Sequence, residues 1–243
     1  MKTIGLLKKL KRRYDRSMEE ARMMACKKSY SQSGEDLIID YIFTNYLHIP
    51  RPTYLDIGAH HPTYLSNTYL FYKKGCCGVC VEPDRTLYDE IRKKRCNDTC
   101  LNVGVGLAGA SKAPFYIMSE KTLNTFSQEE AERYQGYGQY RINEIIQVDL
   151  LPINAIISHN FSTCPNFISL DVEGLDYQIL KSMDFQKYRP EIFCIETLTF
   201  AQDKSERKLD EIVLLMRDNG YIVYADTYIN TIFIDNEAWS KRK

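Results

Sequence analysis

The sequence predicts an α/β protein with a doubly wound, mainly parallel sheet. Apolar strand-like segments alternate with helical segments along most of the chain, and the connections between them are short. Several strands are apolar almost throughout, which is typical of parallel strands buried on both faces. Two adjacent strands close the chain and predict an antiparallel edge. The length of 243 residues suits one domain with one hydrophobic core.

A basic segment, residues 1–28, precedes this domain, which we place at residues 29–243. Residues 1–30 hold ten Lys or Arg against three acids, a balance of +7; the whole chain holds 32 of each, so residues 31–243 carry −7. Apolar residues spaced by three and four predict a basic N-terminal helix, namely Ile4, Leu7, Leu10, Tyr14 and Met18. We expect this helix to pack on its own domain or on a partner, or to contact anionic lipid at a membrane surface.

The first half of the domain reads as a helix followed by strand and helix units. Ser33-Gly34-Glu35-Asp36 precedes an apolar run over 37–43 and predicts the start of a helix. Strands are expected where short apolar runs end at Gly, Asn or an acid, at 53–57, 78–82 and 100–105. Helices are expected between them, at 67–74 and 84–94. A fourth strand over 113–118 predicts an excursion hairpin, and the polar residues 119–141, which have no clear period, predict an insertion.

The second half returns to the same alternation. A strand is expected over 145–150, and the runs 166–171 and 191–196 are apolar strands with an acid at the tip. A helix is expected over 176–183. Another over 205–218 ends at Asn219-Gly220, because glycine permits the left-handed conformation after a helix. Strands over 221–225 and 231–234 form the closing hairpin.

Composition excludes several classes of protein. No window contains the roughly 18 consecutive apolar residues of a membrane span, and the apolar stretch from Ile4 to Leu7 is shorter than the ~7 to 15 residues of a signal peptide core. Eight cysteines without such a signal indicate reduced thiols. A net charge of zero argues against nucleic acid as a partner. We therefore expect a cytoplasmic protein, with possible attachment of residues 1–28 to the inner membrane surface.

Chemically informative residues gather where the expected strands end. Ligands of open parallel sheets bind at the carboxyl ends of the strands. Gly58 follows Asp56 at the first strand end and lets a ligand approach the backbone, while Glu82, 26 residues after Asp56, can accept both hydroxyls of a ribose. His60-His61-Pro62 stands where a dinucleotide site has further glycines. This pattern favours a nucleoside cofactor with a cationic amine, such as S-adenosylmethionine.

The ordered set of motifs resembles that of the FkbM-type methyltransferases. The resemblance runs from about Tyr30 to Ile234 and leaves only the basic segment outside. It rests on Ser31-Gln32-Ser33-Gly34-Glu35-Asp36, Tyr54-Leu55-Asp56-Ile57-Gly58-Ala59-His60-His61-Pro62, Ser66-Asn67-Thr68, Val81-Glu82-Pro83, Asn102-Val103-Gly104-Val105-Gly106 and Ser169-Leu170-Asp171-Val172-Glu173-Gly174.

This resemblance implies a class I, Rossmann-like methyltransferase fold with a seven-stranded, mainly parallel sheet and an antiparallel edge strand. It also implies S-adenosylmethionine as the methyl donor and O-methylation of a hydroxyl on a sugar, polysaccharide or glycosylated metabolite. Carried over by position, the cofactor-binding residues are Asp56, Gly58 and Ala59 at the methionine, Glu82 at the ribose, Asn102, Val103 and Gly104 at the adenine edge, Gln32 and Glu35 closing the pocket, and Asp171.

Methyl transfer to a hydroxyl needs a group that aligns the oxygen and takes its proton. The candidate catalytic residues lie at strand tips or beside the first strand, namely Asp171, Glu173, Glu196, His60 and His61. Alternatively Asp171, Glu196 and His61 hold Mg²⁺ or another divalent ion, which would lower the pKa of the alcohol. The Tyr, Gln and Gly residues of 134–140 are candidates for stacking on sugar rings.

Two other functions stay open at this point. A nucleotide-dependent oxidoreductase would also use a nucleoside cofactor, although the missing G-x-G-x-x-G turn speaks against it. A non-catalytic binding module could keep the same fold and attach through its basic N-terminus. The acceptor, a glycan or a small molecule with a hydroxyl, is not specified by the sequence.

Overall fold

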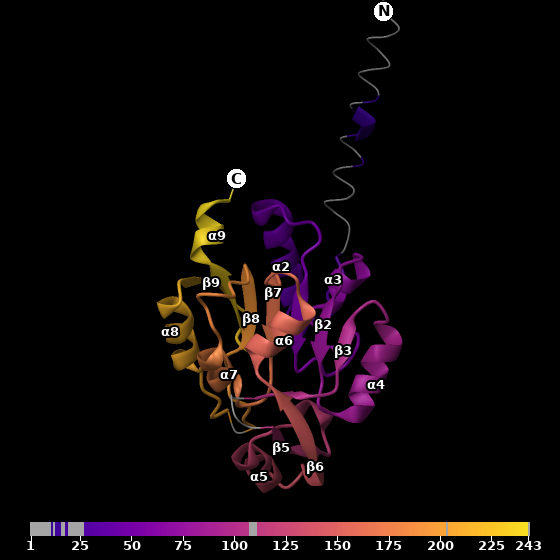
Figure 1. Ribbon diagram of the computed structural model, residues 1–243, viewed down its shortest axis with the longest axis vertical. Coiled ribbons are helices and arrows are strands. Elements are labelled where there is room, and N and C mark those ends of the chain that lie inside the picture. Colours follow the sequence, from indigo (N-terminus) through magenta and orange to yellow (C-terminus); the bar gives the residue numbers. More distant parts are fainter. Residues whose placement is uncertain are drawn as a thin grey trace, which may run out of the picture.

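A seven-stranded sheet forms the centre of the computed structural model, which describes residues 11, 13–15, 18, 27–106, 111–202 and 204–242 (Figure 1). The strand order is β3-β2-β1-β7-β8-β10-β9, and β10 runs antiparallel to both of its neighbours whereas the first five strands are parallel. The strands are β1 (Tyr54–Ile57), β2 (Gly78–Val81), β3 (Thr99–Leu101), β7 (Phe167–Leu170), β8 (Ile192–Glu196), β9 (Tyr221–Asp226) and β10 (Asn230–Asp235). The predicted mainly parallel sheet with its antiparallel edge is confirmed.

Helices cover both faces of this sheet, as a doubly wound fold requires. One face packs against α6 (Ile153–Asn160), α7 (Asp176–Ser182) and α8 (Asp210–Asp218). The other packs against α2 (Glu35–Ile42), the π-helical turn η1 (Phe43–Leu47), α3 (Tyr69–Lys73), α4 (Arg85–Lys94) and α9 (Asn236–Ser240). Successive strand residues point to opposite faces. Leu55 and Ile57 of β1 therefore belong to the first layer, while Tyr54 and Asp56 point toward the second.

A smaller sheet lies at one end of the molecule, below the main sheet in Figure 1. It has the order β4-β6-β5 and consists of β4 (Gly104–Val105), β6 (Ile142–Leu151) and β5 (Lys112–Met118). β5 and β6 pair as an antiparallel hairpin over almost their whole length, which confirms the predicted excursion. Between them lie the short helix η2 (Lys121–Leu123) and α5 (Gln128–Gly136).

Four details of the expected elements were wrong. Residues 100–105 are two strands in two sheets, because the chain leaves β3 at Asn102 and joins the smaller sheet at Gly104. The helix expected over 205–218 begins only at Asp210, since Lys208 forms an isolated bridge with Leu198. The helix α5 occupies part of the segment expected to be without period. Finally, α6 was not expected at all; it follows Pro152, whose fixed φ suits a helix start.

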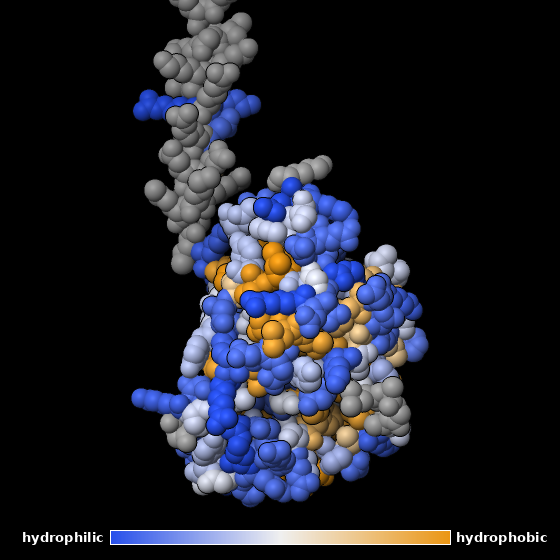
Figure 2. All heavy atoms as spheres, turned by 90° about the vertical axis from the view of Figure 1, so that its left-hand side faces the viewer, coloured by the Kyte–Doolittle hydropathy of each residue, from blue (hydrophilic) through white to orange (hydrophobic). Residues whose placement is uncertain are grey.

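The basic N-terminal segment lies mostly outside the described residues, and its expected contacts stay a prediction. Its described residues, at 11, 13–15 and 18, are helical, and Tyr14 and Met18 are exposed. Figure 2 shows apolar side chains gathered on the face of the molecule at the β9 edge of the main sheet. Leu214 of α8 is 58% exposed. Within the described residues, no helix is long and apolar enough to cross a membrane.

Candidate functional site

A cavity of about 470 Å³ opens where the main sheet and the smaller sheet meet. It is lined by residues that follow four neighbouring strands: Gly58 after β1, Glu82 after β2, Asp171 after β7 and Glu196 at the end of β8. The volume lies in the range of small-molecule sites, roughly 300 to 1,000 Å³. The cavity therefore stands at the carboxyl edge of the sheet, where the sequence placed the ligand.

Gly58 allows the ends of β1 and β7 to approach each other. Its φ is +77°, and a Cβ at this position would lie 1.8 Å from the backbone oxygen of Asp171. The sequence led us to expect close approach of a ligand to this glycine. The structure shows that the glycine is needed first for the contact between the two strand ends, which brings Asp171 next to the turn after β1.

Glu82 presents a fixed carboxylate to the cavity. Its side chain is almost fully buried; Oε2 accepts the His60 backbone N–H at 2.8 Å, and Oε1 accepts the Asp84 backbone N–H at 2.8 Å. Burial raises the pKa of Glu82 to about 8. Each carboxylate oxygen keeps a lone pair for a further donor. A diol such as a ribose can supply both donors, and the predicted ribose-binding role stays a prediction.

The residues expected at the adenine edge shape the cavity from behind. Asn102 donates from Nδ2 to the backbone oxygens of Glu82 and Pro83, both at 2.9 Å, and fixes the turn after β2. Val103 packs against the core. Gly104 makes room for an aromatic ring, because a Cβ there would lie 2.3 Å from Cζ of Phe126. None of the three lines the cavity itself, although their neighbours do.

Aromatic and apolar side chains supply a wall that was not expected from the sequence. Phe115 of β5 and Phe126 line the cavity with their ring centroids 4.6 Å apart, and Leu87 and Pro83 face the same space. This wall suits the flat, apolar faces of an adenine. Phe115 lies in the expected strand 113–118 and Phe126 in the segment without clear period, and neither could be placed at a site before the smaller sheet was known.

Two residues expected at the methionine lie away from the cavity. The carboxylate of Asp56 is buried, accepts the Thr68 hydroxyl and pairs with the fully buried Arg95 at 3.6 Å. Ala59 is buried with Cys80 and Ile91. Asp56 was expected at the methionine, but its side chain points away from the cavity, into the helical layer that holds Arg95.

The N-terminal motif contributes one of its two expected residues. Gln32 lines the cavity. Glu35 is fully buried beside it, where its Oε1 accepts the Thr227 hydroxyl at 2.6 Å and Nδ2 of Asn230 at 3.1 Å. Glu35 thus supports the wall rather than closing the pocket. Asn67, from the Ser66-Asn67-Thr68 motif, also lines the cavity and was not among the expected site residues.

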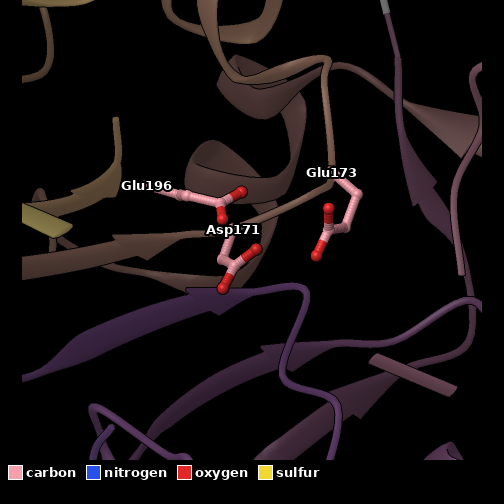
Figure 3. A group of neighbouring side chains, drawn as sticks. All are labelled: Asp171, Glu173 and Glu196. Carbon is pink, nitrogen blue, oxygen red and sulfur yellow. The ribbon is translucent and has the colours of Figure 1, made fainter. Parts of the chain in front are cut away.

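Asp171, Glu173 and Glu196 form an acidic group on the side of Gly58 opposite Glu82, because β7 and β8 lie on one side of β1 and β2 lies on the other. Each offers a carboxylate oxygen, and the three oxygens lie within 4.8 Å of one another (Figure 3). Burial raises the pKa of Asp171 to about 6, and burial together with the neighbouring carboxylates raises the pKa of Glu173 and of Glu196 well above the usual range. Among the described residues, no Lys, Arg or His makes an ion pair with this group.

Glu173 is held in place by the segment between β5 and β6. Its φ is +52°, in the left-handed region that a residue with a side chain rarely adopts. The Tyr134 hydroxyl donates to Oε2 of Glu173 at 3.0 Å, and the Thr125 hydroxyl donates to its backbone oxygen at 2.8 Å. The insertion therefore fixes one member of the acidic group.

The two candidate histidines have different positions. His60 lines the cavity, and burial lowers the pKa of its imidazole. His61 is not a member of the acidic group: its Nδ1 accepts the backbone N–H groups of Thr63 and Tyr64 at 3.1 and 2.8 Å and so stabilises the turn. The expected metal set of Asp171, Glu196 and His61 is corrected accordingly, with Glu173 in the place of His61.

The aromatic stretch 134–140 lies behind the cavity wall. Tyr134, Tyr137 and Tyr140 pack around Phe200, with ring centroids 5.5, 6.3 and 6.1 Å away. Phe200 itself lines the cavity, as does Tyr228, which is 58% exposed. The tyrosines expected to stack on a sugar therefore hold in place another ring that faces the ligand space.

Comparison with known proteins gives one match in sequence. The family described as Methyltransferase FkbM domain matches residues 56–223. No curated protein matches the chain.

Several solved structures resemble the chain at low sequence identity. A TehB-like SAM-dependent methyltransferase from Corynebacterium glutamicum is 10% identical with a TM-score of 0.42, over 91% of this chain and 97% of that one. A precorrin-6y C5,15-methyltransferase from Geobacter metallireducens is 12% identical with a TM-score of 0.39, over 86% and 92%. The 1,6-didemethyltoxoflavin-N1-methyltransferase from Burkholderia thailandensis is 9% identical with a TM-score of 0.42, over 93% and 85%.

Proposed function

Because the chain belongs to the FkbM methyltransferase family and is an S-adenosylmethionine-dependent methyltransferase of class I fold, we propose that it methylates a hydroxyl of a sugar, polysaccharide or glycosylated metabolite. The observation that supports this acceptor chemistry is the acidic group of Asp171, Glu173 and Glu196 beside the cofactor half of the cavity. An alcohol needs such a group because it is a poor nucleophile at neutral pH.

The cofactor half of the cavity fits S-adenosylmethionine, which supplies an electrophilic methyl group on its sulfonium when bound. Glu82 accepts the ribose hydroxyls, and Phe115 and Phe126 pack on the adenine. Gln32 and Asn67 line the same cavity. The amide of Gln32 would face the amino acid end, while Nδ2 of Asn67 already donates to the Ser169 hydroxyl. Gly58 and Asp171, which meet at the ends of β1 and β7, would then lie on the methyl side of the cofactor.

Asp171 is our candidate for the base that takes the hydroxyl proton. Its pKa of about 6 leaves it ionised at neutral pH and still a useful proton acceptor. With S-adenosylmethionine bound, its sulfonium would supply the methyl group to the hydroxyl oxygen and keep the electron pair of the broken carbon–sulfur bond, and the carboxylate of Asp171 would take the hydroxyl proton. Glu173 and Glu196 orient the acceptor. His60, which lines the cavity, is the second candidate base.

The same three carboxylates could instead hold a divalent cation. Carboxylate oxygens within 4.8 Å of one another suit a hard ion such as Mg²⁺, which would lower the pKa of a bound alcohol. Titration of the purified protein with EDTA and then Mg²⁺ decides between the two roles. Restored activity on adding the ion supports the metal, whereas full activity in EDTA supports Asp171 acting alone.

Asp171→Asn tests the proposed function most directly. We expect the variant to bind S-adenosylhomocysteine in calorimetry with wild-type affinity and to transfer methyl groups at least about a hundredfold more slowly. Asp89→Asn is the control, because Asp89 is an exposed residue of α4 outside the cavity. Transfer is followed with an isotopically labelled methyl donor and cell-surface glycan extract, and the product is identified by mass spectrometry.

Two outcomes would favour the alternatives. The family match already favours methyl transfer over nucleotide-dependent oxidation, and quenching of NADH fluorescence on titration would reopen that question. A protein that binds S-adenosylhomocysteine but labels nothing in any extract would be a non-catalytic module.

We also propose a cytoplasmic location, with residues 1–28 contacting the inner membrane surface or a partner and no nucleic acid bound. Their balance of positive charge supports this proposal. Co-sedimentation with vesicles containing anionic lipid tests it, with a chain lacking residues 1–28 as the control. Equal sedimentation of the two proteins would contradict it.

A further inference from the structure

The half of the cavity beyond Gly58 is lined by four carboxylates. Asp171, Glu173 and Glu196 are joined by Glu206, from the loop that precedes α8. Lys121 is the one lysine among the described residues that line the cavity, and it lies on the cofactor side, where its Nζ is 3.8 Å from Oδ2 of Asp84. No Lys or Arg among the described residues lines the acceptor half of the cavity.

The polar donors on this side already have protein partners. The Tyr228 hydroxyl donates to Oε1 of Glu206 at 2.9 Å, Nδ2 of Asn230 donates to Glu35 at 3.1 Å, and Nδ2 of Asn67 donates to the Ser169 hydroxyl at 3.1 Å. Lys208, close to Glu206 in sequence, donates to Asp226 and Thr197. The side chains of this wall can therefore accept hydrogen bonds from a ligand but can donate few.

Asn230 provides a second, independent observation. It is 4% exposed, lines the cavity and lies directly opposite Glu196 in the antiparallel pairing of β8 with β10. Its Oδ1 is buried and has no hydrogen-bond partner among the described residues. A buried acceptor without a partner is costly. A ligand that brings donors to the acidic wall would relieve this cost.

The balance of charge stays negative under each proposed mechanism. Asp171 and Glu206 carry −2 even with Glu173 and Glu196 neutral, and a divalent cation on Asp171, Glu173 and Glu196, with all four carboxylates ionised, would also leave −2. The single sulfonium charge of the methyl donor does not cancel this excess. Phe200 adds an aromatic face, which attracts cations and packs on sugar rings, whereas the ring of Tyr228 already has Nζ of Lys208 5.9 Å from its centroid.

From these features we infer that the acceptor is cationic: a sugar or sugar-like alcohol with a protonated amine near the hydroxyl that is methylated. This inference rests on the proposed function. Glu206 is the residue that binds the ammonium group, because it lies outside the group of three and is anchored by Tyr228 at the rim of the cavity. Sugars with a carboxylate or phosphate are rejected by the same wall.

The charge of the labelled product tests the inference even while the acceptor is unidentified. The full-length protein is incubated with labelled methyl donor and a hydrolysed glycan and metabolite extract, the unreacted donor, itself a cation, is identified in a control without protein and subtracted, and the remaining label is separated at pH 7 on cation- and anion-exchange resins. We expect the label on the cation exchanger. Label in the neutral or anionic fraction overturns this inference and leaves the proposed methyltransferase intact, whereas no label in any fraction overturns both.

The variant Glu206→Gln tests the residue. It keeps an oxygen for the Tyr228 hydroxyl and removes only the charge. With the labelled acceptor, KM should rise roughly tenfold, while kcat and the affinity for S-adenosylhomocysteine stay unchanged. Glu211→Gln, an exposed residue of α8 outside the cavity, is the matched control. Equal KM values for the two variants would overturn the role of Glu206.

Discussion

Replacing Glu82 by Gln should change how the stability of the ligand-free protein depends on pH. Glu82 is 4% exposed, and its two backbone donors, the N–H groups of His60 and Asp84, do not compensate for the loss of water around its charge. Burial therefore raises its pKa from 4.5 to about 8. The folded protein binds a proton at this site between these two values, whereas the unfolded chain has already released it.

The sign and size of the effect follow from this difference. Between pH 4.5 and 8 the folded state holds more protons than the unfolded state, so the free energy of unfolding falls as the pH rises. Each tenfold change in proton affinity corresponds to about 1.4 kcal/mol. The rise of the Glu82 pKa to about 8 thus removes on the order of 5 kcal/mol across this range. Glutamine does not titrate and lacks this contribution.

Urea denaturation of wild type and Glu82→Gln at pH 5 to 9 measures the contribution. The amide of the variant places an N–H against a backbone N–H, which costs about 1 to 3 kcal/mol at every pH. The quantity to compare is therefore the change in the free energy of unfolding with pH, and not its value at any one pH. The stability of wild type relative to the variant should fall by several kcal/mol between pH 5 and 9. A difference that stays constant within about 1 kcal/mol would refute the reasoning.

Binding of S-adenosylhomocysteine gives a second measurement on the same two proteins. The ionised carboxylate accepts both ribose hydroxyls, so wild-type affinity should increase as the pH passes 8. The variant should bind at least about tenfold more weakly and without this pH dependence. Glu90→Gln, an exposed position on α4, is the control for both experiments.

Three further substitutions test the surroundings of the site. Gly58→Ala should lose stability and cofactor affinity, because its Cβ would meet the backbone oxygen of Asp171. Gly75→Ala is the control: Gly75 also has a positive φ, +83°, but no atom lies within 4 Å of its Cβ position, so this variant introduces the backbone strain without the clash. Arg95→Met leaves two buried carboxylates without their cation and should cost about 3 to 5 kcal/mol in urea denaturation; a loss below about 1 kcal/mol would contradict this. Tyr134→Phe removes the donor to Glu173 and keeps the ring contact with Phe200, so kcat should fall roughly tenfold with unchanged affinity for S-adenosylhomocysteine.

The main sheet could be predicted because its strands carry a local signal. Parallel strands that are covered on both faces are short apolar runs. In β1, β2, β7 and β8 nearly every residue is buried, whichever face of the sheet its side chain is on. The path from β3 to β4 lacked such a signal, since two apolar residues on either side of Asn102 look like one strand. Asn and Gly are disfavoured in strands. Asn102 and Gly104 could therefore have indicated the break.

The sequence carries a local signal for the start of helix α5. Ser127 caps it by accepting the Glu130 N–H at 3.2 Å, and Ser followed three residues later by Glu is typical of a helix start. The helix is mostly polar, because it buries only Ala131 and Tyr134. Its weak apolar face explains why periodicity alone did not reveal it.

The direction of a side chain at a strand end could not be predicted. Asp56 and Glu82 both belong to strand ends with acids, yet Glu82 faces the cavity and Asp56 faces Arg95. Arg95, the partner that determines the direction of the Asp56 side chain, lies 39 residues after Asp56, just beyond the last turn of α4. A strand pattern fixes which residues share a face, but the helix that covers this face is set by the tertiary fold.

The two halves of the cavity differ in how far the sequence could specify them, and the difference has a physical origin. The cofactor half depends on strand ends, whose positions follow from the sheet. The acceptor half depends on Phe200, Glu206 and Tyr228, which lie in connections held by side-chain contacts with the insertion and with one another. Such contacts leave no period in the sequence. The cofactor was therefore predictable from strand ends, whereas the charge that selects the acceptor emerges only once Glu206 and the acidic group line one wall.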